Sequence, residues 1–202
     1  MIDKICEFLT NRIRKEMPEI DDERAEVINY GLQNIVGEIP KIFIVLGVAW
    51  ILGIFNLTLY TFLLLLPYKS FSGGFHLKTH LGCIICTTLF YCGIATLSKY
   101  VVLEQAAKYI ITLLIWGFGM WMVKLYAPAD TENVPILKKD IRRKKQILSY
   151  ITLTIGLLLA VFIPNTEIAN ILIIGNFIQT LCITKFAYKI TDNKYGYEVY
   201  GN

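Results

Sequence analysis

Long apolar runs separated by short polar breaks dominate the chain after residue 40. They cover approximately residues 41–55, 57–68, 80–98, 107–125, 147–164 and 167–187. A helix needs about 20 residues to cross a bilayer, so the last four runs predict full spans. The first two are each too short for a straight span and, taken together, too long for one span. The pattern therefore predicts an all-α integral membrane protein with about six membrane-embedded segments, of which the first two form a hairpin or a re-entrant pair.

The first 38 residues carry a different pattern, in which apolar positions recur between charged ones at helical spacing. Ile5, Leu9 and Ile13 lie four residues apart, and Pro18 is expected to end this helix. The acidic run Asp21-Asp22-Glu23 favours the start of a second helix, because carboxylates are stabilising at a helix N-terminus. Both segments are predicted to be amphipathic helices lying on the membrane surface.

Basic residues indicate which side of the membrane each polar break faces. The predicted loop at residues 138–145 contains six basic residues and one acidic residue, and such loops stay in the cytoplasm. The N-terminal region is also rich in basic residues, so an even number of crossings is expected between the two. The break at residues 73–83 and both termini are therefore predicted to face the cytoplasm. The chain is predicted to form one polytopic domain, with interfacial helices over 1–38, a membrane core over 41–187 and a cytoplasmic tail over 188–202.

Composition narrows the class of protein further. Of 202 residues 55% are hydrophobic and 18% are charged, and the charged residues cluster at the breaks. A transporter or channel places ionisable residues inside the membrane, and these apolar runs carry almost none. A peptide transporter and a non-catalytic peptide-binding scaffold are therefore kept only as alternatives to an enzyme. The chain has five cysteines, an odd number, and most of them lie in apolar runs. No disulfide framework is therefore expected.

The break before the third apolar run carries the candidate chemistry. Gly73-Gly74 favours a bend, and Thr79 is a plausible N-cap for a helix whose first turns include Cys83. On one continuous helix His76 and Cys83 would lie about 10 Å apart along the axis, too far for proton transfer. The bend instead allows the histidine to fold back toward the thiol. A helix N-terminus and a histidine both stabilise a thiolate, the activated nucleophile of acyl-transfer enzymes.

Other assignments of these residues stay open. His80, three residues before Cys83, competes with His76 as the base. His80, Cys83 and Cys86 form an H-x-x-C-x-x-C pattern to which His76 would add a fourth zinc ligand, but most of these positions share one apolar run and no metal is expected. Cys83 and Cys86 also form the C-x-x-C of thiol oxidoreductases, which a reducing cytoplasm disfavours. Lys69 either binds a substrate carboxylate or anchors its helix at the interface.

Two strings of this sequence resemble the accessory gene regulator B (AgrB) family of membrane cysteine endopeptidases in bacterial quorum sensing. The first is Gly73-Gly74-Phe75-His76 with Cys83 seven residues after the histidine. The second is Tyr126 to Ile136, which reads Tyr-Ala-Pro-Ala-Asp-Thr-Glu-Asn-Val-Pro-Ile. Tyr30-Gly31-Leu32 is a third, weaker similarity. The resemblance covers nearly the whole chain, including its length and the order of its segments.

The resemblance implies a specific reaction. Cys83 would be the nucleophile and His76 its general base in cleaving the C-terminal part of a small amphipathic AgrD-like propeptide. A Cys83 thioester acyl-enzyme would form first, and a cysteine of the peptide would then close a thiolactone ring. No cofactor is expected. The expected partners are the propeptide and the lipid bilayer, with a homo-oligomer left open and no nucleic acid.

Several residues are assigned only as support for this site. Substrate-binding or structural roles are expected for Lys69, Gly73, Gly74, Pro128 and Asp130. The family usually has arginine at the position of Lys69, and lysine lacks the bidentate geometry for a carboxylate. A third catalytic residue is not assigned, and the possible ones are Glu26, Gln33, Glu38 and Asp130.

Overall fold

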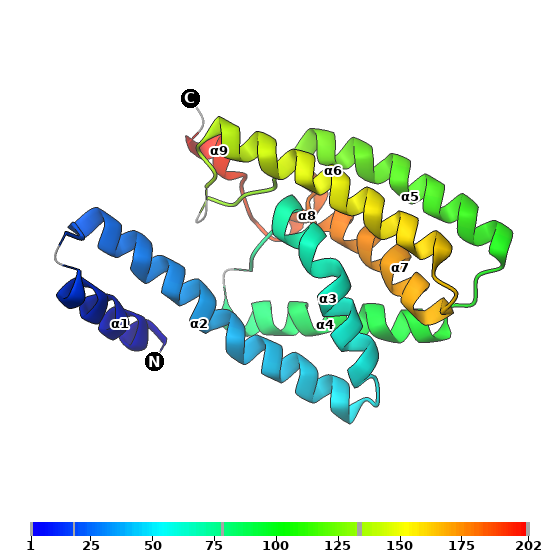
Figure 1. Ribbon diagram of the computed structural model, residues 1–202, viewed down its shortest axis with the longest axis horizontal. Coiled ribbons are helices and arrows are strands. Elements are labelled where there is room, and N and C mark those ends of the chain that lie inside the picture. The colour runs from blue at the N-terminus through cyan, green and yellow to red at the C-terminus, as the bar shows by residue number, and fades with distance from the viewer. Residues whose placement is uncertain (1, 18, 78, 133–134, 201–202) are drawn as a thin grey trace.

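The computed structural model describes residues 2–17, 19–77, 79–132 and 135–200, and within these ranges the chain is helical (Figure 1). The elements are α1 (Ile2–Glu16), α2 (Asp22–Ile51), α3 (Phe55–Ser72), α4 (His80–Tyr100), α5 (Gln105–Tyr126), α6 (Lys139–Phe162), α7 (Thr166–Cys182), α8 (Lys185–Ile190) and α9 (Gly196–Tyr200).

Helix α7 is the centre of the bundle, because it packs against α3, α4, α5 and α6. Helices α1 and α2 form a hairpin at one edge (Figure 1), and α2 also packs against α3 and α4. The ends of α3, α5 and α7 and the starts of α4 and α6 lie on the same side of the bundle. The polar segments that join these ends therefore meet at one place.

The all-α character is confirmed within the described ranges and is consistent with a membrane protein, but six spans are not confirmed. Among the described residues, three helices are long and apolar enough to cross a bilayer, namely Leu81–Tyr100, Gln105–Tyr126 and Lys139–Phe162. The last predicted span is shorter than expected, because α7 has 17 residues and ends at Cys182, after which Thr184 caps α8. The first predicted apolar run is the second half of α2, a helix of 30 residues that continues through Pro40.

Two further expectations from the sequence are corrected. The basic segment at residues 138–145 is not a loop, since Lys138 is the N-cap of α6 and the helix includes residues 139–145. Lysine, arginine and glutamine favour helix, and Asp140 lies in the first turn, where a carboxylate is stabilising.

The segment expected to be a tail is packed into the bundle. Tyr188 and Tyr195 are only 2% and 1% exposed, and their rings stack with centroids 4.0 Å apart. Both belong to the same buried cluster as Tyr68 and Val123. Aromatic rings bury a large apolar area while their hydroxyls find partners, so tyrosines in a polar segment can dock it firmly.

The local signals for helix starts are confirmed at the two predicted positions. Asp21 caps α2 by accepting a hydrogen bond from the Arg24 amide at 2.8 Å. Thr79 caps α4 by accepting one from the Gly82 amide at 3.2 Å. Pro18 lies outside the described residues, and α1 ends before it at Glu16.

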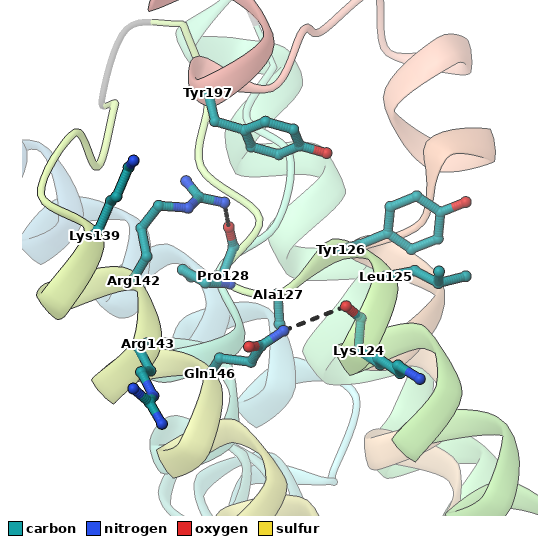
Figure 2. A pocket seen from close by; sticks show the side chains of 10 residues that line it. All are labelled: Lys124, Leu125, Tyr126, Ala127, Pro128, Lys139, Arg142, Arg143, Gln146 and Tyr197. Atoms are coloured by element: carbon teal, nitrogen blue, oxygen red, sulfur yellow. Dashed lines mark hydrogen bonds between the residues drawn. The ribbon is translucent and has the colours of Figure 1, made fainter. Parts of the chain in front are cut away.

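A pocket of about 390 Å³ opens where the end of α5 meets the start of α6 (Figure 2). Its basic lining residues are Lys124, Lys139, Arg142 and Arg143. Gln146 closes its floor by donating hydrogen bonds to the carbonyls of Val123 and Lys124. The Arg142 guanidinium lies 4.6 Å from the Tyr197 ring centroid, so the C-terminal segment forms one wall.

Candidate functional site

The Gly-Gly bend is required by the backbone, as the sequence predicts. Gly73 ends α3 with φ 75° and Gly74 follows with φ 146°, values that residues with a side chain rarely adopt. Space demands glycine as well, because a Cβ at Gly73 would collide with the backbone of Ala129. The chain therefore turns sharply here and leads His76 toward the start of α4.

Backbone pairing with the second motif holds this bend. The Ala129 amide donates to the Ser72 carbonyl at 2.8 Å, and the Gly74 amide donates to the Ala129 carbonyl at 2.9 Å. Gly73 and Ala129 thus form a short parallel bridge. The two strings that carry the family resemblance are in direct contact, although more than fifty residues separate them in the sequence.

Two side chains from the C-terminal third also hold this bend, and we call them and the Gly73–Ala129 bridge together the clamp. Gln179 of α7 is fully buried and donates to the Gly73 carbonyl at 2.8 Å and to the Ser72 hydroxyl at 3.0 Å. Asn193 donates to the carbonyl of His76 at 2.8 Å. The position of the histidine backbone is therefore determined by segments on both sides of it.

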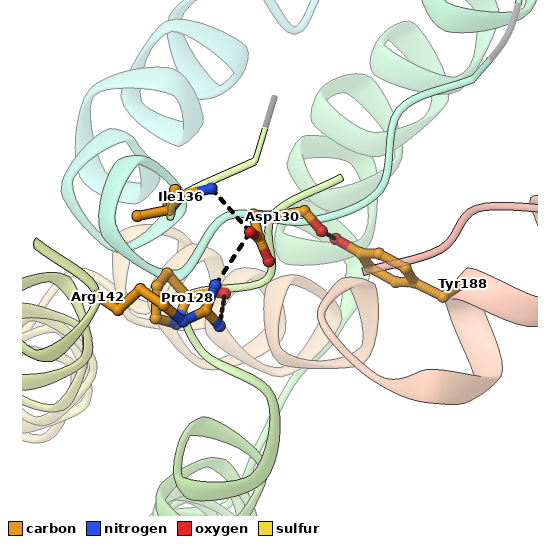
Figure 3. A network of polar contacts seen from close by, with 5 residues as sticks. All are labelled: Pro128, Asp130, Ile136, Arg142 and Tyr188. Atoms are coloured by element: carbon orange, nitrogen blue, oxygen red, sulfur yellow. Dashed lines mark hydrogen bonds and ion pairs between the residues drawn. The ribbon is translucent and has the colours of Figure 1, made fainter. Parts of the chain in front are cut away.

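A buried ion pair organises the second motif (Figure 3). The Asp130 side chain is 0% exposed, and its Oδ2 lies 3.0 Å from Arg142 Nη1 of α6. The same oxygen accepts a hydrogen bond from the Ile136 amide, and the Asp130 carbonyl accepts one from the Tyr188 hydroxyl. Arg142 also donates to the carbonyl of Pro128. These contacts favour structural support over substrate binding for Pro128 and Asp130.

Cys83 lies where the sequence predicts, at the start of α4. Its amide donates to the Thr79 carbonyl at 2.9 Å, which places it directly after the first turn, and its side chain is half-buried. His76 is exposed on the preceding turn. The Lys41 ammonium, buried on α2, acts electrostatically on both Cys83 and His76. Both motif residues therefore lie in the field of the same cation.

Charges around His76 favour its neutral form. Although the side chain reaches the surface, protein packed around the imidazole desolvates it and lowers its pKa below the ordinary value. The cations of Lys69 and Lys41 lower that pKa further, whereas the Glu38 carboxylate raises it. A histidine that loses its proton below its ordinary pKa is available as a base at neutral pH.

Lys69 extends from the end of α3 over α4. Its Nζ lies 4.8 Å from the centroid of the Phe90 ring, a cation–π contact that fixes the ammonium in place. From there it acts electrostatically on His76, Cys86 and Cys182. Lys69, which lies in the last turn of α3, is thus part of the charge environment of the histidine.

The alternatives for the site differ in how far the structure addresses them. All five cysteines are free, so Cys83 and Cys86 are not joined. Across the part of the chain that the structure describes, no three His, Cys, Asp or Glu side chains are grouped to hold a metal. The side chains of His80, Glu26 and Gln33, like Tyr30-Gly31 of the weaker string, lie outside the described part.

Several residues of this region were missed by reading the sequence. Lys41 signals only topology there, and Asn193 stands in an expected tail. Gln179 is different, because a signal for it exists. Polar residues inside an apolar run are expected to face protein instead of lipid, and four of them are buried in α7: Asn170, Asn176, Gln179 and Thr180.

Comparison with known proteins decides the family. The model of the family described as accessory gene regulator B matches residues 6–183. The chain belongs to the accessory gene regulator B family. Family membership supports involvement in the agr quorum-sensing system, of which this family is the processing component.

Relatives align over most of their length. A Listeria monocytogenes protein named AgrB-like is 29% identical over 193 residues, which are 93% of this chain and 91% of that protein. An AgrB-like protein of Clostridium perfringens is 30% identical over 76% of this chain and 73% of its own. The accessory gene regulator protein B of Staphylococcus haemolyticus is 24% identical over 94% of this chain and 97% of its own. No solved structure matches the chain significantly.

Proposed function

We propose that this protein is a membrane cysteine endopeptidase that cleaves an AgrD-like propeptide on its C-terminal side. The observation that carries the proposal is the placement of His76 on the held bend before α4 and of Cys83 directly after the first turn of that helix. The Gly-Gly bend and its clamp supply the preorganisation that such a pair requires.

The proposed reaction uses these two residues in turn. Neutral His76 takes the proton of the Cys83 thiol as the sulfur attacks the scissile carbonyl carbon. The carbon–nitrogen bond then breaks, the imidazolium gives its proton to the leaving amine, and a thioester remains on Cys83. A cysteine thiol of the peptide attacks this thioester, which releases the Cys83 thiol and closes a thiolactone. One thioester replaces another, so ring closure needs no ATP.

Co-expression with candidate propeptides from the same genome tests the function. We expect a cleaved C-terminal fragment with the unmodified chain and none with His76→Ala, provided that both proteins insert equally. Cleavage that persists with His76→Ala would remove the proposed base. A peptide transported intact, with no fragment, would favour transport or binding instead.

The pH dependence of cleavage is expected to report the charges around His76. Cleavage should rise with pH as His76 loses its proton, with the rise below the ordinary pKa of histidine because burial and Lys69 disfavour the imidazolium. Lys69→Met removes one cation, so the pKa of His76 increases and the rise moves to higher pH. Lys99→Met, at the opposite end of α4, is the matched control. An unmoved profile in Lys69→Met would contradict this environment for the base.

The basic pocket of Figure 2 is proposed to recruit the peptide along the inner membrane surface. The basic segment offers four residues for this role: Lys138, Lys139, Arg142 and Arg143. Arg142 is now set aside, because its pairing with Asp130 makes its replacement a test of folding. Lys139 and Arg143 line the pocket from α6 and are suited to the experiment.

Charge reversal at the pocket is expected to weaken binding and to leave the chemical step unchanged. Lys139→Glu with Arg143→Glu should raise KM about tenfold at low salt while kcat holds, since exposed charge pairs contribute up to about 1 kcal/mol each. Lys144→Glu with Lys145→Glu makes the same change on the same helix outside the pocket lining. Equal losses in both variants, or an inverted topology, would mean that the basic segment only sets orientation.

The topology is part of the same proposal. The turn after α3 and the segment after α5 meet at one end of the bundle, together with the basic start of α6. Because basic segments stay in the cytoplasm, the site and both termini are proposed to face the cytoplasm.

A further inference from the structure

Lys41 is a buried lysine on the face of α2 that packs on α4. Lys41, Val45 and Ala49 are spaced four residues apart, and all three are buried, Lys41 being 7% exposed. Residues four apart lie on one helix face, and Val45 and Ala49 pack against Tyr91 and Cys92 of α4. The same face therefore carries Lys41 one turn farther along, toward the N-terminal part of α4.

An apolar residue would suit this position in a helix interface, because burying an ammonium is unfavourable unless it is paired. Lys41 Nζ lies 2.5 Å from Glu38 Oε1 on its own helix. Glu38 is about half exposed, so its carboxylate is hydrated on one side and compensates the buried ammonium only in part. Cys83 lies in that N-terminal part of α4, within electrostatic range of the Lys41 ammonium.

We propose that Lys41 is the charge partner of Cys83 and stabilises the sulfur anion when His76 removes the thiol proton. This inference rests on the proposed function of Cys83 as the nucleophile. The two groups have separate roles. His76 removes and transfers the thiol proton, whereas Lys41 stays protonated and stabilises the thiolate electrostatically. A cation beside a cysteine is an established way to favour its ionised form.

With this assignment, Lys41 and not His76 supplies the positive charge that stabilises the Cys83 thiolate. His76 is disposed to be neutral, so before proton transfer it offers no positive charge to the sulfur. The other titratable and charged groups of the cluster are Glu38 on α2, Lys69 on α3, Cys86 on α4 and Cys182 on α7. Among these groups, Lys41 is buried on the face of α2 toward α4 and acts electrostatically on Cys83.

Alkylation of Cys83 by iodoacetamide, followed across pH by peptide mass spectrometry in lipid nanodiscs, tests the proposal. In Lys41→Met the alkylation rate at pH 7 should fall about tenfold and its pH midpoint should move up, because a nearby opposite charge favours the ionised form by at least that factor. Lys41→Arg should restore most of the rate. Lys99→Met controls for loss of a lysine elsewhere on the protein.

Glu38→Gln gives a readout of opposite sign, which a merely structural role would not produce. Removing this carboxylate leaves the Lys41 charge undivided, so the midpoint of Cys83 alkylation should move down. This variant also serves if Lys41→Met fails to fold. Midpoints unchanged in folded Lys41→Met, or unchanged in Glu38→Gln, would overturn the assignment of Lys41.

Failure of this inference can be told apart from failure of the proposed function. If Cys83→Ala still cleaves the propeptide, the nucleophile is wrong and the role of Lys41 falls with it. If Cys83→Ala is inactive but Lys41→Met leaves the pH midpoint of Cys83 alkylation unchanged, only the assignment of Lys41 as charge partner is wrong.

Discussion

Replacing Cys83 with alanine is expected to reduce propeptide cleavage by a factor on the order of 10⁴ or more, which leaves no fragment in a co-expression assay. Removing the nucleophile of a covalent mechanism eliminates the acyl-enzyme, and only binding and oxyanion stabilisation remain. The thiol is half-buried at the start of α4, so alanine leaves the helix and its cap intact. Insertion and helix content should therefore equal those of the unmodified protein.

Cys86→Ala is the matched control for this experiment. Cys86 lies on the same helix one turn farther along, is also half-buried and is free. We expect this variant to retain cleavage, because the proposed chemistry uses a single thiol. Loss of cleavage in both variants would instead support the C-x-x-C reading, in which the two thiols act together.

Asp130→Ala is expected to destabilise the protein by about 3 kcal/mol, the lower end for a buried pair, because it leaves the partly buried Arg142 guanidinium without its counter-charge. The Ile136 amide loses its acceptor as well. Cleavage should fall too, since the motif that carries Asp130 pairs with the bend before His76. Denaturant unfolding in detergent, followed by circular dichroism, measures the first effect.

Two controls isolate the ion pair. Asp140→Ala removes an exposed carboxylate from the first turn of α6 and should cost less than about 1 kcal/mol. Asp130→Ala combined with Arg142→Met removes both charges and should recover much of the loss, because an apolar pair avoids the unpaired buried charge. Equal destabilisation by Asp130→Ala and Asp140→Ala would contradict the structural role of the second motif.

The local features of this fold could be predicted from neighbouring residues alone. A capping side chain, a positive backbone angle and an apolar run each act over a few positions. The sequence therefore predicted a helix start at the acidic run 21–23, the cap at Thr79, the bend at Gly73 and Gly74, and the placement of Cys83 just inside a helix.

The contacts that hold the site could not be predicted in this way. Asn193 meets the His76 carbonyl across 117 residues, and Gln179 meets that of Gly73 across 106. Such pairs depend on how α7 and the C-terminal segment pack, which no local pattern contains. The sequence does contain one signal for Gln179, because an amide inside an apolar run is expected to be buried and to need a hydrogen-bond partner.

The basic segment and Lys41 show a second limit. Clustered cations in a sequence mark the membrane side, since topology rules count charge and ignore structure. In the structure Arg142 pairs with the buried Asp130, and Lys41 acts electrostatically on the proposed nucleophile. Basic residues that indicate membrane orientation can thus also form ion pairs or act on side chains inside the same protein.

Mass spectrometry of the intact protein after co-expression with a propeptide tests the central claim most directly. The account predicts a peptide thioester on Cys83 that hydroxylamine removes and that is absent in Cys83→Ala. A correctly inserted protein that cleaves its propeptide without any adduct on Cys83, or that carries the thioester on another cysteine, would contradict it.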